Sequence, residues 1–160
     1  MIEKPCMHCC IDAYLSAFQP GLWERKAVVK SEWRHIIRGF HAAGAAVARA
    51  GNLVIIDDVL ETEPPWVASL QELFAGIPVI FVGVHCPLEE LERREHVRND
   101  RKTGLARFQF AQVHAQALYD IEVNTSVLQS NECARMILEW MRAKHSSSAW
   151  KRLAEKQRSV

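Results

Sequence analysis

Length, composition and charge limit the chain to a narrow set of protein classes. It has 160 residues, of which 49% are hydrophobic, and its 20 basic and 19 acidic side chains leave a formal net charge of +1. This length supports one domain with a hydrophobic core and is too short for two ordinary domains. The near-neutral balance excludes general attraction to nucleic acid or to an anionic membrane, so any anion site must be local.

The cysteines predict a protein of the reducing cytoplasm. There are five, at positions 6, 9, 10, 86 and 133, an odd number without paired spacing, and the sequence has no signal peptide or long apolar span. The spacing of Cys6 and Cys9 matches half of a zinc site, but no second ligand pair follows. We therefore interpret Pro5–Ile11 as a short apolar strand that ends at Asp12.

The spacing of apolar residues predicts strands and helices in alternation along the chain. The expected elements are, in chain order, a strand at 6–10, a helix at 11–18, a helix from a Ser31 cap to Gly51, a strand at 53–57, a helix at about 65–75, a strand at 78–84, a helix beginning at Pro87, an amphipathic segment from Phe110 to Ala117, a strand at 120–124 and a closing helix through 134–141. This order predicts an α/β fold with a parallel sheet built from right-handed crossovers. The residues after Lys144 predict a basic tail that is either frayed or docked as a separate helix.

Carboxylates follow two of the predicted strands. Leu53–Ile56 is wholly apolar and is followed directly by Asp57 and Asp58, which places acid groups where open α/β sheets hold their chemistry. Asp57 is expected to organise a phosphate-bound magnesium ion, although either aspartate can instead cap the next segment or pair with a basic neighbour. Asp12 has the same placement, and both a proton-accepting base and a helix N-cap remain open there.

A basic segment between the central and last parts of the fold predicts a lid. Arg93–Arg107 holds five arginines and one lysine against two acidic residues, whereas no glycine-rich phosphate-binding loop occurs anywhere in the sequence. Guanidinium groups suit the spread charge of a transferring phosphoryl group, so we favour a lid over a solvated face. His114, Tyr119 and Asp120 are expected to fix the last crossover by hydrogen bonds, with substrate contact as the alternative.

Several motifs taken together are specific where each alone is weak. They are Ile11-Asp12, Ile55–Val59, Val82–Cys86, Arg94-Glu95, Arg98, Asp100-Arg101, Gly104, Ala106, Val113-His114 and Tyr119–Thr125. From Pro5 to about Met141, the chain resembles the chloramphenicol phosphotransferases, small P-loop kinases that phosphorylate a hydroxyl of this antibiotic.

The resemblance implies roles for individual residues. Asp12 corresponds to the catalytic base, Arg98 and Arg101 lie in the lid that closes on phosphate, Arg94 joins them in contacting the cofactor, and Asp57 serves the metal. ATP and Mg²⁺ are the implied cofactors. A small hydroxylated molecule, chloramphenicol first, is the implied partner, with no nucleic acid or membrane, and a homo-oligomer remains open. The implied organisation is a kinase-like domain over 1–144, with a lid at about 93–107, and a tail over 145–160.

The chain also departs from the family pattern. Family members begin with a strand and a glycine-rich loop that cradles the ATP phosphates, and this chain starts after both. We therefore expect a P-loop kinase-like three-layer fold that lacks its first, central strand, so that 53–57 and 120–124 lose hydrogen-bond partners between them. We expect that the chain is a truncated or mis-started reading of a longer protein. The alternative is a complete but inactive relative, kept as a binding or interaction module.

Overall fold

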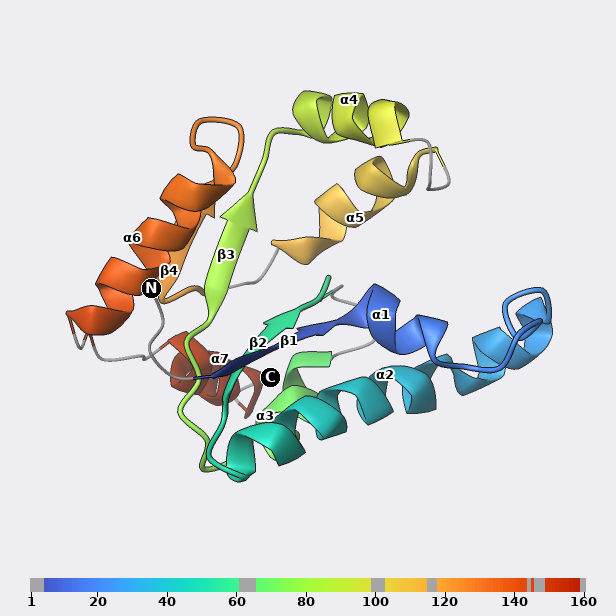
Figure 1. The fold of residues 1–160 in the computed structure, drawn as a ribbon, viewed down its shortest axis with the longest axis horizontal. Coiled ribbons are helices and arrows are strands. Elements are labelled where there is room, and N and C mark those ends of the chain that lie inside the picture. Colours follow the sequence, from blue (N-terminus) through green and yellow to red (C-terminus); the bar gives the residue numbers. More distant parts are fainter. Residues whose placement is uncertain are drawn as a thin grey trace. The chain divides into compact units, whose positions relative to one another are not determined.

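The computed structural model describes residues 5–60, 66–98, 103–114, 118–143, 145 and 149–158. The chain forms two compact units, each described by itself below (Figure 1). The first comprises Met1–Asp58 and Glu72–Ile77, and the second comprises Val59–Gln71 and Pro78–Val160. Among the described residues, no helix has the length and apolar character needed to cross a membrane.

The first unit is built on two parallel strands. β1 (Cys6–Cys10) pairs with β2 (Leu53–Asp57) from Cys6 opposite Leu53 to Cys10 opposite Asp57. Two helices connect these strands, α1 (Ile11–Ser16) and α2 (Lys26–Arg49), and α2 buries an apolar stripe that includes Phe40. Gly44 lets α2 approach β2 closely, because a Cβ there would lie 2.9 Å from the Cδ1 atom of Ile56.

The second unit has its own parallel pair, β3 (Val82–His85) and β4 (Ile121–Asn124). Its helices are α4 (Leu88–Arg98), α5 (Leu105–Val113), α6 (Ser130–Arg142) and α7 (Ala149–Arg158), whereas α3 (Trp66–Leu73) spans the division between the units. Helices α4 and α5 lie side by side, and α6 packs beside β4 (Figure 1).

The sequence predicted the class, the element order and all four strands correctly. Among the described residues, strand pairing is limited to one parallel pair in each unit.

Several predicted boundaries were wrong, among them the beginnings of α2, of α5 and of the strand expected from residue 78. Ser31 does not cap α2, which begins at Lys26; its hydroxyl donates instead to the Val28 carbonyl oxygen at 2.9 Å, a bond that lets serine sit inside a helix. The strand expected from residue 78 begins only at Val82. The Phe81 N–H donates to the Asp120 carboxylate at 2.9 Å rather than to a neighbouring strand.

The C-terminal helix α7 is docked rather than frayed. Ala149 and Leu153 are only 3% and 4% exposed, and the rings of Phe81 and Trp150 lie 5.6 Å apart. The Asp120 carboxylate accepts the backbone N–H groups of Phe81 and Ala149, both at 2.9 Å. Asp120 therefore has the structural role expected for it, and it also anchors the helix of the tail.

Candidate functional site

The first unit brings Asp12 and Asp57 to the same edge of its sheet. Asp57 ends β2 opposite Cys10, the last residue of β1, and α1 follows β1 without a gap. Asp12 lies in the first turn of α1, and the N-cap position belongs to Cys10, which makes no side-chain capping bond. The N-cap interpretation of Asp12 is therefore wrong, and two carboxylates lie at the carboxyl ends of adjacent parallel strands.

The two adjacent aspartates after β2 have different environments. The Asp58 side chain is 12% exposed, and its Oδ2 lies 2.7 Å from Nε2 of His41, which is 1% exposed. Asp57 is 69% exposed, with its Oδ2 3.7 Å from Nε2 of the equally open His8. Pairing with a basic neighbour thus explains Asp58, whereas Asp57 presents its oxygens to solvent.

Aromatic contacts hold the helix that carries Asp12. The Tyr14 ring lies 5.5 Å from the rings of both Phe18 and Phe40. Gly39 on α2 allows this approach, because a Cβ there would lie only 2.6 Å from the Tyr14 hydroxyl oxygen. The position of Asp12 therefore depends on the packing of α1 against α2.

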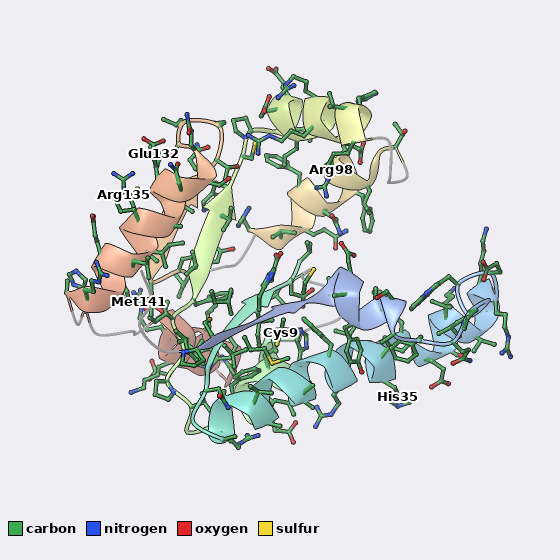
Figure 2. The ribbon with its side chains drawn as sticks, in the orientation of Figure 1. Cys9, His35, Arg98, Glu132, Arg135 and Met141 are labelled. Atoms are coloured by element: carbon green, nitrogen blue, oxygen red, sulfur yellow. The ribbon has the colours of Figure 1, made fainter. Side chains whose placement is uncertain are left out.

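The described parts of the segment predicted to form a lid belong to two adjacent helices, called the hairpin below. Helix α4 continues through the arginine-rich sequence to Arg98, and α5 begins at Leu105. Figure 2 labels Arg98 beside this hairpin, and Arg101 lies outside the described residues. The high charge does not end α4, because Glu90 pairs with Arg93 and Arg94 along the helix at 2.7 Å each.

Glutamates of α4 tie it to α5. The Glu95 carboxylate accepts the backbone N–H groups of Gly104 and Ala106, both at 2.8 Å, and these bonds hold the pKa of Glu95 below its ordinary value. Glu92 pairs with Arg107 of α5 at 2.8 Å. The hairpin therefore has two separate links, one to the backbone and one to a side chain.

Arg94 joins α4 to the loop after β4. Its guanidinium donates to the Thr125 carbonyl oxygen at 2.7 Å, to the Thr125 hydroxyl at 3.1 Å and to Glu90 at 2.7 Å. Hydrogen bonds from Arg93 and Arg94 lower the pKa of Glu90 to about 2. Glu90 is therefore a carboxylate at neutral pH, and it fixes the orientation of the Arg94 side chain.

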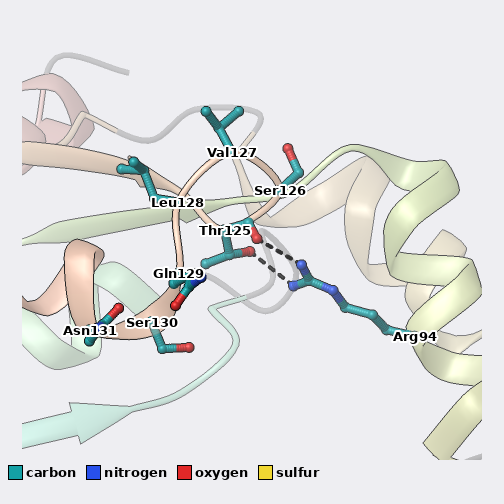
Figure 3. A pocket seen from close by; sticks show the side chains of 8 residues that line it. All are labelled: Arg94, Thr125, Ser126, Val127, Leu128, Gln129, Ser130 and Asn131. Carbon is teal, nitrogen blue, oxygen red and sulfur yellow. Dashed lines mark hydrogen bonds between the residues drawn. The ribbon is translucent and has the colours of Figure 1, made fainter.

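A pocket of about 660 Å³ opens beside Arg94 (Figure 3). It is lined by Arg94 and by the loop and helix start at Thr125, Ser126, Val127, Leu128, Gln129, Ser130 and Asn131. The Asn124 side chain holds this loop by accepting both the backbone N–H and the hydroxyl of Ser126, at 2.9 and 2.7 Å. The pocket thus combines a fixed cation with polar loop groups at the carboxyl end of β4.

Four titratable side chains form a cluster on β3, β4 and the end of α5. The rings of His85 and His114 stack at 4.1 Å, the His85 Nε2 lies 2.7 Å from the Glu122 carboxylate, and the His114 Nδ1 lies 2.6 Å from the Tyr119 hydroxyl. Burial, and then the neighbouring His85, lower the pKa of His114, and burial with the charge of Glu122 raises that of Tyr119 to about 12. His114 and Tyr119 are therefore neutral at pH 7, which suits the structural role expected for them.

Sequence reasoning missed three contributors to this region. Thr125 lies 31 residues from its partner Arg94, and Glu95 reaches N–H groups beyond a turn, so neither contact has a local signal in the sequence. Asn124, the third contributor, did have a local signal in the sequence. An asparagine with a serine two residues later is typical of an Asx turn.

Known proteins resemble this chain over most of its length. A model of the family described as "CPT: Chloramphenicol phosphotransferase-like protein" matches residues 1–142. Two relatives from Mycobacterium tuberculosis, "Putative O-phosphotransferase Rv2636" of strain H37Rv and "Putative O-phosphotransferase MT2714" of strain CDC 1551, are each 38% identical over 106 residues. This match covers 66% of the chain and 47% of each relative, so the chain spans about half the length of the curated relatives it matches. Its short parallel sheets fit a P-loop kinase-like fold, and the chain belongs to the chloramphenicol phosphotransferase-like family.

Proposed function

We propose that this chain serves an ATP-dependent phosphotransferase that phosphorylates a hydroxyl of a small molecule, with chloramphenicol as the favoured acceptor. The observation that carries the proposal is the placement of Asp12 and Asp57 at one edge of the β1–β2 sheet, in a chain of this family. A base and a metal-binding carboxylate at adjacent strand ends suit a reaction that activates a hydroxyl beside a phosphate.

Asp12 is proposed as the general base. Its carboxylate accepts the proton of the acceptor hydroxyl while the hydroxyl oxygen forms a bond to the γ-phosphorus of ATP. The bond from that phosphorus to the bridging oxygen breaks, and ADP leaves with the electron pair. The exposed position of Asp12 in the first turn of α1 leaves room for an acceptor molecule beside it.

Asp57 fits the chemistry of a magnesium site. Mg²⁺ usually takes one or two protein carboxylates and completes its shell with waters and substrate phosphates, and Asp57 offers one exposed carboxylate. When bound, the ion supplies positive charge to the transferring phosphate.

We assign nucleotide contacts to the second unit. Arg94 lines the pocket and is held there by Thr125 and Glu90, so it supplies a fixed positive charge for an anionic cofactor. Arg98 and Arg101 are proposed to neutralise the phosphates as the hairpin closes.

Family membership bears on the acceptor, and the free cysteines bear on the compartment. Family membership favours chloramphenicol, and hence antibiotic resistance by inactivation, but fold and reaction class do not fix an acceptor. We place the protein in the cytoplasm, where ATP is supplied and where its five free cysteines would remain reduced.

The test is ATP-dependent phosphorylation of chloramphenicol, measured with this chain and with the same chain extended by any in-frame residues encoded upstream. Asp12→Asn should lower kcat by about 10²- to 10⁴-fold, because it removes the proton acceptor. Glu24→Gln, which changes an exposed carboxylate of the same unit, should leave the rate unchanged. Full activity in Asp12→Asn would refute the assignment. No transfer from either protein to chloramphenicol or to other hydroxylated acceptors would favour an inactive binding module.

A further inference from the structure

A side chain of α4 bonds the start of α5. Helix α5 begins after Gly104, whose φ of +92° carries the chain through a left-handed turn, and no side chain of its own N-terminus caps it. The Glu95 carboxylate, three residues before the end of α4, accepts the N–H groups of Gly104 and Ala106 at 2.8 Å. Glu95 therefore caps the neighbouring helix rather than its own.

We propose that Glu95 is a positioning residue, whose carboxylate clamps α4 to the start of α5 and so presents Arg98 to the phosphates of the nucleotide. This inference rests on the proposed function, because it assigns Arg98 a phosphate. Arg98 is the last residue of α4, one helical turn beyond Glu95, so a clamp at Glu95 fixes the helix end that carries the guanidinium. The charge of the carboxylate strengthens both bonds to the backbone, since charged acceptors bind N–H groups about twice as strongly as neutral ones.

Glu92 provides a matched control. It lies on the same helix, three residues earlier, and reaches the same partner helix, but its carboxylate bonds to the side chain of Arg107, at 2.8 Å. Glu92→Gln and Glu95→Gln remove the same charge from neighbouring positions. Only Glu95→Gln weakens the acceptor of two backbone N–H groups.

The sign of the effect separates positioning from simple electrostatics. Removing a negative charge near a polyphosphate strengthens binding by Coulomb attraction alone. A clamp predicts the opposite, because Arg98 is then held less well. Weaker ATP binding in Glu95→Gln than in Glu92→Gln therefore cannot arise from the change in net charge.

The experiment measures amide hydrogen exchange and ATP affinity on the same three proteins at neutral pH. In Glu95→Gln, we expect the amides of Gly104 and Ala106 to exchange about tenfold faster than in the wild type, from the loss of a charge-assisted bond. In the same variant, ATP binding should weaken several-fold. The fold decrease in kcat should exceed the fold increase in the KM for the acceptor. Glu92→Gln should leave the exchange of both amides unchanged.

Each outcome has a separate meaning. Unchanged exchange of the two amides in Glu95→Gln refutes the clamp. Faster exchange with unchanged ATP affinity and kcat overturns the positioning role and leaves a cap only. A wild-type protein that neither binds ATP nor transfers phosphate overturns the proposed function and the positioning role with it, while the exchange of the two amides still reports on the clamp.

Discussion

Gly83→Ala should destabilise the second unit through one side chain, Tyr119. Gly83 lies in β3, and a Cβ added there would come within 2.5 to 2.8 Å of three atoms of the Tyr119 ring, closer than carbon atoms approach. The ring is held by Phe81 at a centroid distance of 5.0 Å and by the hydroxyl contact of 2.6 Å to His114. It therefore cannot move without losing contacts.

The size of the effect follows from these contacts. Overpacking a well-filled site costs about 1–3 kcal/mol, and a lost hydrogen bond adds about 1 kcal/mol. The smaller entropy of the unfolded alanine chain returns about 0.4–1 kcal/mol. We expect Gly83→Ala to lower the free energy of unfolding by about 1–3.5 kcal/mol, measured by urea denaturation with circular dichroism.

A double-mutant cycle identifies the cause. In a Tyr119→Ala background the added methyl meets no ring, so Gly83→Ala should cost less than about 0.5 kcal/mol. In Tyr119→Phe, which keeps the ring and loses the hydroxyl, most of the cost should remain. An equal cost of Gly83→Ala in the wild type and in Tyr119→Ala would refute the reasoning.

Three further predictions concern single carboxylates and one histidine. Asp58→Ala should cost about 1–3 kcal/mol in urea denaturation because it removes the carboxylate that contacts the buried His41 ring. Asp57→Ala changes an exposed side chain and should cost less than about 0.5 kcal/mol, and equal costs would contradict the assignment. Asp120→Ala should lower the thermal midpoint and raise the hydrogen exchange of the two backbone N–H groups it accepts; unchanged exchange would show that another group holds them. Because the pKa of His114 is lowered in the folded protein, the unfolded chain binds this proton more readily, and the free energy of unfolding should fall as pH drops below 6.5. His114→Gln should remove this contribution to the pH dependence, measured by denaturation at several pH values.

The sequence predicted those features that depend on local pattern. The apolar run of β2 and the carboxylate that ends it have a period and a boundary visible within six residues, and the structure confirms the strand and pairs it with β1. The predicted beginning of α2 was wrong because serine has two roles in helices. It often caps a helix, but it also occurs within one, where its hydroxyl donates to the carbonyl oxygen three residues earlier.

The site required information that no local pattern contains. Asp58 is paired and Asp57 is exposed because His41 on α2 contacts Asp58. His41 lies 17 residues from Asp58 in the sequence, and periodicity does not identify it as the partner. Arg94 was predicted as a cofactor contact from its family motif, whereas its bonds to Thr125 depend on how β4 pairs with β3. Such contacts follow from tertiary packing, so a single sequence can name the residue but not its partner.

Because α7 is docked, the second unit extends beyond the end of the family match. The family match ends at residue 142, yet Ala149 and Leu153 beyond it are among the most buried side chains of the second unit. A shortened protein ending at residue 142 would expose the faces of Phe81 and Asp120 that this helix covers. Expression of the family-matched portion alone would therefore yield a species with a new apolar patch and a tendency to self-associate, whatever its catalytic competence.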